Sequence, residues 1–127
     1  MQLGEKQLLK VVKKVEFGVY LGEEDSEERV LLPIKQVPEN IQVGDGLEVF
    51  LYKDSKDRLI ATTREPAVTL GQIAKLPVKE VTKIGAFLDW GLEKDLFLPF
   101  KQQTHRVHPG EECLVGLYTD KSGRLCA

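Results

Sequence analysis

Short runs of alternating apolar and polar residues, separated by turn residues, fill most of this chain. Such alternation predicts half-buried β-strands, and a series of them is typical of a small all-β barrel or sandwich. Helical periodicity is nearly absent, and Pro38 interrupts the one stretch where a helix is conceivable. We predict strands at Leu8–Glu16, Gly18–Gly22, Arg29–Pro33, Leu47–Lys53 and Arg58–Thr62, and again at Val78–Lys83, Ala86–Trp90, Asp95–Pro99, Glu112–Thr119 and Arg124–Ala127.

The second half of the chain repeats the first. Residues 29–61 align with residues 95–127 at an offset of 66 residues without a gap, and residues 17–21 align with residues 84–88 at an offset of 67. A fixed period of this kind indicates two copies of one structural unit. We therefore predict two domains, residues 1–65 and 66–127. Residues 63–77 join the units and hold too little apolar surface to form a domain of their own.

Each predicted unit has five strands with its longer connection between the third and the fourth. This arrangement suits the OB-fold, a partly open Greek-key barrel. An SH3-like barrel has a similar number of strands and stays open as an alternative. We predict two tandem five-stranded OB-fold barrels.

Composition supports a globular chain and places it by default in the cytoplasm. Of its 127 residues, 42% are hydrophobic and 30% are charged. No apolar run approaches the length of a membrane span, and the first residues lack the order of a secretory signal. Cys113 and Cys126 have no metal-type spacing and lie in apolar strand patterns, so we expect buried reduced thiols, with a disulfide as the lesser alternative.

Charge neither supports nor excludes a polyanionic partner. The net charge is -2. Residues 1–65 carry ten Lys/Arg and thirteen Asp/Glu, while residues 66–127 carry eight and seven. Much of the acidic excess comes from the run at residues 23–28, which is typical of a solvated loop.

Aromatic residues flank a glycine in the first copy, Phe17-Gly18-Val19-Tyr20, and the second copy reads Ile84-Gly85-Ala86-Phe87. A glycine between two rings allows a bend that brings both to one surface. Rings exposed on a strand face can stack on bases. For Tyr20 and Phe87, packing inside the barrel is the alternative. Phe97 and Trp90 are further stacking candidates, and packing between the two units is the alternative for Trp90.

An acid and an arginine span the last hairpin of each unit: Asp54 with Arg58, and Asp120 with Arg124. Such an arginine can contact phosphate or stack on a base, and the carboxylate can accept a hydrogen bond from a base amino group. A surface ion pair within the hairpin is the alternative. After the third strand, Lys35 and Lys101 are either phosphate contacts or members of a solvated loop.

Catalytic chemistry finds no support in the sequence. The carboxylates at residues 24–28 have no partner base, and His105-Arg106-Val107-His108 has no further metal ligand at a suitable spacing. Neither a nucleophile arrangement nor a phosphate-binding glycine loop occurs. We therefore expect no enzyme activity, no cofactor, no metal, no small-molecule substrate and no membrane association.

The run Gly85-Ala86-Phe87-Leu88-Asp89-Trp90-Gly91, with Leu96 and a closing Asp…Gly-Arg-Leu, resembles the S1 RNA-binding domain. The resemblance implies an OB-fold that binds single-stranded RNA through aromatics beside this glycine, a third-strand histidine, and an Asp and Arg around the last hairpin. By this resemblance the candidate residues are Phe17, Tyr20, Asp54 and Arg58 in the first unit, and Phe87, Asp120 and Arg124 in the second.

Two departures from the S1 pattern stand out. Ile84 replaces the first aromatic, and Leu32 and Leu98 are expected at the histidine position. Both departures imply weaker or less selective binding. Since the second unit is nearer the S1 pattern, we expect it to dominate contact with RNA.

A longer run, residues 85–103, is similar to the conserved virulence factor B family of bacterial cytoplasmic proteins. Those proteins combine tandem S1-type units with a C-terminal winged-helix domain and are RNA-binding regulators. The likeness implies an RNA-binding regulator of gene expression, with further C-terminal domains missing from this chain. A protein-interaction module that has lost RNA binding is the alternative, because the first unit is acidic and the histidine is absent.

Overall fold

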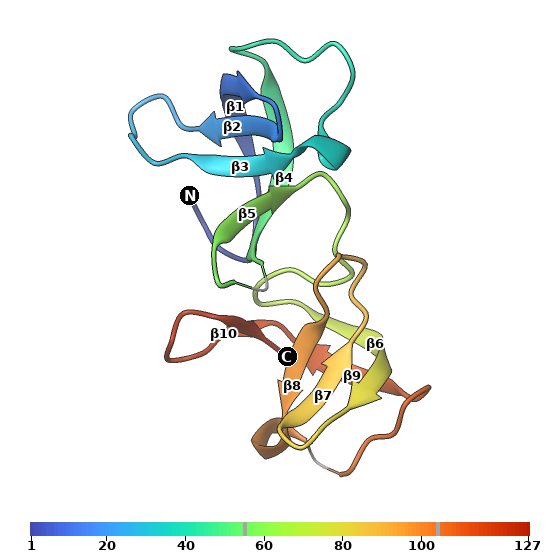
Figure 1. The fold of residues 1–127 in the computed structure, drawn as a ribbon. Coiled ribbons are helices and arrows are strands. Elements are labelled where there is room, and N and C mark those ends of the chain that lie inside the picture. Colours follow the sequence, from blue (N-terminus) through green and yellow to red (C-terminus); the bar gives the residue numbers. More distant parts are fainter. Residues whose placement is uncertain (55, 104) are drawn as a thin grey trace. The chain divides into compact units, whose positions relative to one another are not determined.

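The computed structural model describes residues 1–54, 56–103 and 105–127. The chain forms two compact units, Met1–Arg64 and Glu65–Ala127, and the regular structure of each consists almost entirely of strands (Figure 1). The all-β prediction is confirmed. The two helical elements in the described ranges are single 3-10 turns, η1 (Ile34–Gln36) and η2 (Phe100–Gln102). No helix in those ranges is long and apolar enough to cross a membrane.

The first unit is a closed barrel with the strand order β1-β2-β3-β5-β4, in which β4 returns to β1. Figure 1 shows β1 to β5 in blue to green. The β3–β5 pairing, between Leu31 and Ile60, is parallel, and the other pairings are antiparallel. This is the topology of an OB-fold. Its strands are β1 (Lys6–Val15), β2 (Gly18–Gly22), β3 (Val30–Pro33), β4 (Gly46–Lys53) and β5 (Leu59–Thr62).

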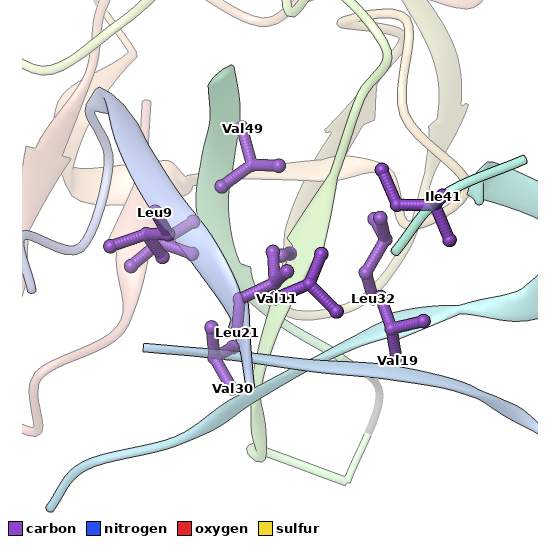
Figure 2. Packing of buried hydrophobic residues seen from close by; sticks show 10 residues of the cluster. Leu9, Val11, Val19, Leu21, Val30, Leu32, Ile41 and Val49 are labelled. Atoms are coloured by element: carbon purple, nitrogen blue, oxygen red, sulfur yellow. The ribbon is translucent and has the colours of Figure 1, made fainter. Parts of the chain in front are cut away.

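Aliphatic side chains from every strand fill the interior of this barrel (Figure 2). Alternate residues of a strand point to opposite faces, so the inward set fixes which residues face outward. Burying one such side chain stabilises the fold by about 1.5–3 kcal/mol. The buried cluster consists of Leu9, Val11, Val19, Leu21, Val30, Leu32, Ile41, Val49, Leu51 and Ala61.

The second unit repeats this plan in a more open form. It contains a four-stranded sheet, β8-β7-β6-β9, and a two-stranded sheet, β10-β11. Leu117, between β9 and β10, forms an isolated parallel bridge with Leu70. The Ala127 N–H donates to the Phe97 carbonyl at 2.8 Å, where β3 and β5 pair in the first unit. The strands are β6 (Ile73–Val81), β7 (Gly85–Leu88), β8 (Leu96–Pro99), β9 (Glu112–Gly116), β10 (Tyr118–Thr119) and β11 (Leu125–Cys126).

Two strand predictions for the second unit are wrong. The strand predicted at Val78–Lys83 begins earlier, at Ile73, inside the expected connector. Pro77 suggests a break, but it lies where β6 leaves β9 and turns to pair with β7, a position where a missing N–H is tolerated. The strand predicted at Glu112–Thr119 is divided at Leu117, because residues on either side of it pair with different partners.

Candidate nucleic-acid interface

A row of side chains crosses the outer face of each barrel. In the first unit Lys13 pairs with Tyr20, and Tyr20 pairs with Leu31. Residues in register face the same side of a sheet, and the neighbours of Tyr20 along its strand, Val19 and Leu21, are in the core. Lys13, Tyr20 and Leu31 therefore form an outward row. The corresponding row of the second unit is Glu80, Phe87 and Phe97.

Gly18 lets two rings meet on this outer face. It has φ +153°, and a Cβ there would lie 2.2 Å from the Leu32 carbonyl oxygen, so only glycine fits so close a strand crossing. The Phe17 and Tyr20 rings lie 6.3 Å apart at 87°, in an edge-to-face contact, and Phe17 is 55% exposed. This geometry agrees with the bend expected from the sequence.

The second unit repeats the glycine but not the aromatic pair. Gly85 also has φ +153° and lies against the Leu98 carbonyl, where a Cβ would be 2.5 Å away. Ile84 takes the place of Phe17 and is exposed. Phe87 instead meets Phe97 across the strands, with centroids 5.2 Å apart at 39°. Both rings are half-buried, and each unit thus presents one aromatic pair.

The two third-strand leucines expected at the histidine position face inward. Leu32 and Leu98 are buried with 0% and 4% exposure, so they point into the barrels. A side chain on this strand that contacts a ligand must face outward. Leu31 and Phe97 face outward on these strands, and they pair with Tyr20 and Phe87.

A β-bulge widens the row beside Tyr20. Val11 pairs with Leu21 and Lys13 pairs with Tyr20, so Val12 is the extra residue of the bulge. A bulge sets two residues opposite one, which turns the strand locally. Val12, Lys13, Tyr20 and Arg29 line a depression of about 360 Å³ at this point.

The same bulge in the second unit carries an ion pair. Val78 pairs with Leu88 and Glu80 pairs with Phe87, which makes Lys79 the extra residue. The Lys79 ammonium lies 3.0 Å from the Asp95 carboxylate, and this hydrogen bond raises the pKa of Lys79. Asp95 corresponds to Arg29 in the repeat.

The hairpin carboxylate of the first unit organises its own loop. Asp54 Oδ1 accepts hydrogen bonds from the N–H groups of Lys56 and Arg58, at 2.9 and 3.0 Å, and Oδ2 lies 3.0 Å from Arg58 Nε. Burial of Asp54 tends to raise its pKa, but these hydrogen bonds outweigh it and the pKa is lowered. The Arg58 side chain stays 70% exposed, so this hairpin positions a cation at the surface.

The hairpin of the second unit is built the same way. Asp120 Oδ1 accepts from the Arg124 and Ser122 N–H groups and from the Ser122 hydroxyl, at 2.7–2.9 Å. The hydrogen bond from the Arg124 N–H, followed by that from the Ser122 hydroxyl, lowers the pKa of Asp120 to about 2. Cys126 Sγ donates to Asp120 Oδ2 at 3.6 Å. In both hairpins the aspartate carboxylate therefore stabilises the loop conformation by accepting its backbone N–H hydrogen bonds.

The two thiols differ from each other. Cys126 is buried as expected, whereas Cys113 is only half-buried, and both are free, so the disulfide alternative is wrong. Burial raises the pKa of both thiols. Within residues 1–54, 56–103 and 105–127, no group of three or more His, Cys, Asp or Glu side chains is placed to hold a metal ion.

The remaining candidates separate by exposure. Lys35 and Lys101 are exposed in η1 and η2. Trp90 is only 2% exposed, and its Nε1 donates to the Lys94 carbonyl at 2.6 Å. Its ring is not offered to solvent, so we leave Trp90 out of the proposed surface.

The sequence-based predictions missed three cationic side chains that lie near aromatic rings. Lys13 and Arg29 line the depression with Tyr20, and the signal for them was a lysine on an outward strand position and an arginine just before the third strand. Arg106 lies over the Phe100 ring at 5.8 Å from its centroid, a cation–π contact. Nothing in the local pattern paired those last two residues, because a loop brings them together.

Comparison with known proteins decides the family. A family model for the S1 domain matches the chain twice, over residues 3–64 and 70–127. The chain belongs to the S1 domain family. The predicted resemblance is confirmed, and both barrels are S1 domains.

Relatives of this tandem S1 chain come from bacteria. It is 33% identical over 96 residues to the uncharacterized protein YitL of Bacillus subtilis, covering 75% of this chain and 32% of YitL. It is 25% identical over 129 residues to conserved virulence factor B of Staphylococcus aureus, covering 97% of this chain and 43% of that protein. The likeness to conserved virulence factor B is thereby confirmed.

A solved structure shares the fold of the tandem S1 chain. It is a multidomain protein with nucleic acid binding domains from Streptococcus pneumoniae, with a TM-score of 0.82 and 23% identity. The match covers 98% of this chain and 44% of that one. The chain thus spans less than half the length of the relatives it matches.

Proposed function

We propose that this chain binds single-stranded RNA through its S1 barrels and has no catalytic role. The observation that carries this proposal is the solvent-accessible pair of rings on the outer face of each barrel, Phe17 with Tyr20 and Phe87 with Phe97. Exposed rings bind unpaired bases by stacking, with about 1–3 kcal/mol lost per base on removal of the ring. The nucleic acid binding domains named for the structural neighbour support the same function.

Cations around the rings supply contacts to the RNA backbone. Arg58 is held at the surface by Asp54, and Arg124 follows the same hairpin geometry through its backbone N–H. Lys35 and Lys101 are exposed in the turns that follow β3 and β8. In this proposal these four side chains contact phosphate or stack on bases, while Asp54 and Asp120 position the hairpins.

The likeness to conserved virulence factor B supports a proposal for the cellular role. Conserved virulence factor B is a bacterial protein that shares the tandem arrangement over nearly the whole of this chain. We propose that the chain is the RNA-binding part of a cytoplasmic regulator of gene expression.

Fluorescence anisotropy with short labelled RNA tests the binding function. Labelled octauridine and octaadenosine are titrated with the whole chain, and competition by a duplex RNA of equal length is the control. Binding that the duplex does not displace supports the proposal. Absence of binding at low salt, or a Tyr20→Ala/Phe87→Ala double variant that binds like the parent, contradicts it.

A protein partner is the second candidate function, and one observation favours it. Ile73 and Leu114 are 71% and 69% exposed on the adjacent strands β6 and β9. They border a depression of about 350 Å³ that Gln102 and Tyr118 also line. Exposed apolar patches often mark protein interaction sites. Leu114→Asp should abolish binding to a protein partner and leave RNA affinity unchanged, whereas an equal loss of RNA affinity assigns this patch to RNA.

A further inference from the structure

We infer that the first barrel, not the second, holds the principal nucleotide site. One nucleotide of single-stranded RNA occupies the depression formed by Val12, Lys13, Tyr20 and Arg29. Its base packs on the Tyr20 ring and Val12, and its phosphate lies between Lys13 and Arg29. This inference rests on the proposed function and reverses the expectation that the second unit dominates.

The backbone places the four residues together for separate reasons. The bulge in β1 sets Val12 and Lys13 opposite the single residue Tyr20. Arg29 comes two residues before Leu31, which pairs with Tyr20, so Arg29 falls on the same outward face. Two strands and the residue that precedes β3 thus contribute to one site, which is the reason that no contiguous motif reveals it.

The lining suits a nucleotide better than a peptide or an apolar ligand. An aromatic ring and a valine line the depression together with the side chains of Lys13 and Arg29. A base needs a π-face and a phosphate needs a cation, and both lie within this depression. Among its four lining residues none is acidic.

Arg29 is held in place before any ligand arrives. Its Nη1 donates to the Ser26 and Glu28 carbonyls at 2.7 and 2.8 Å, and the guanidinium packs over Gly22. A guanidinium has five N–H donors, so two such bonds leave others to point at a phosphate. A cation fixed in advance loses less side-chain entropy on binding.

The corresponding positions in the second barrel are Lys79, Glu80, Phe87 and Asp95. This set in the second barrel contains one cation and two acids, whereas the set in the first barrel contains two cations and no acid. Lys79 is already paired with Asp95 at 3.0 Å, and Glu80 is the cross-strand partner of Phe87. A phosphate approaching this ring meets a carboxylate where the first barrel offers Lys13. The ring pair of the second barrel can stack on a base, but the carboxylates beside its bulge repel the phosphate backbone of the RNA.

Reciprocal charge substitutions in the whole chain test the inference, with labelled octauridine as the probe. Lys13→Glu and Arg29→Asp copy the second barrel into the first, and each should weaken binding about tenfold. Lys13→Gln should also reduce the slope of log affinity against log salt by about 0.7, the value for one phosphate contact on a single strand. Lys75→Glu, the same charge change on an exposed position of β6, is the matched control and should have less than a twofold effect.

The outcomes distinguish a failure of this inference from a failure of the proposed RNA-binding function. If the parent chain binds no RNA, the proposed function fails. If the parent binds, but Lys13→Glu and Arg29→Asp act no more strongly than Lys75→Glu while Phe87→Ala abolishes binding, the function stands and the inference fails. Thermal unfolding followed by circular dichroism identifies any variant that has lost its fold, and Lys13→Gln then replaces Lys13→Glu as the deciding variant.

Discussion

The two barrels share their glycine contacts, hairpin hydrogen bonds and β-bulges, and they differ in the side chains around these features. Gly18 and Gly85 have the same φ and lie against the same carbonyl of the neighbouring strand, and Asp54 and Asp120 accept the same backbone hydrogen bonds. The bulges are also shared, but one presents Val12 and Lys13 and the other Lys79 and Glu80. The backbone positions that shape the barrels are thus retained in both copies, while the charged residues beside the outer rings have diverged.

The shared glycine should produce the largest effect. Gly18→Ala places a Cβ 2.2 Å from a backbone oxygen at a φ that suits glycine, so we expect the first barrel to lose about 3 kcal/mol or more. Gly44→Ala is the control, because its φ is +97° but nothing lies within 4 Å of the new Cβ, and about 1 kcal/mol is expected. Urea unfolding followed by circular dichroism provides the measurement.

Trp90 allows the two barrels to be followed separately. It is the single tryptophan and is buried in the second unit. Its fluorescence should respond strongly to Gly85→Ala, whose Cβ would lie 2.5 Å from the Leu98 oxygen, and weakly to Gly18→Ala. A Gly18→Ala variant as stable as the parent would show that the close strand crossing is not required.

Removing one ring from each barrel should give the next largest effect, on RNA affinity. Tyr20→Ala should weaken binding about tenfold, within the range for one stacked base, and Phe87→Ala about threefold. Tyr20→Phe keeps the ring and should bind like the parent. Anisotropy titration at one salt concentration measures all three, and a larger loss from Phe87→Ala would reverse the ranking of the barrels.

The acidic loop should have a smaller effect in the opposite direction. Glu27 and Glu28 are exposed beside Arg29, and their field opposes an approaching phosphate. Glu27→Gln with Glu28→Gln should therefore raise affinity about twofold to threefold at low salt, and the gain should disappear at high salt. Glu93→Gln with Glu112→Gln, at two exposed positions of the second barrel, removes the same two charges and is the control. An equal gain there would make the effect one of net charge alone.

The hairpin carboxylate of the second barrel should make stability depend on acid. The pKa of Asp120 in the folded chain is about 2, below the value of about 3.9 for a free aspartate, so its contribution to stability is complete above about pH 4. That contribution is lost as the pH falls through 2. Asp120→Asn should be less stable than the parent at neutral pH and lose less on acidification. Trp90 fluorescence in urea from pH 6 to about pH 2 tests this, and parallel curves for the two proteins would contradict it.

The sequence predicted the barrels well where local chemistry decides. Alternation, the glycine between two rings and the acid four residues before an arginine are all short-range signals, and they placed β2, β3 and the hairpins. The sequence-based prediction failed where the structure depends on pairing between strands that are distant in the chain. The start of β6 depends on β9, some forty residues later, and the choice between Leu31 and Leu32 depends on register, where one residue reverses the face. The depression beside Tyr20 needs both the bulge and the neighbouring strand.

Amide chemical-shift mapping with octauridine tests the central claim most directly. We predict the largest shifts at Val12, Lys13, Tyr20 and Arg29, with smaller shifts around Phe87 and Phe97. Shifts centred on Phe87 and Phe97 with none at Tyr20, or shifts confined to Ile73 and Leu114, would contradict the account.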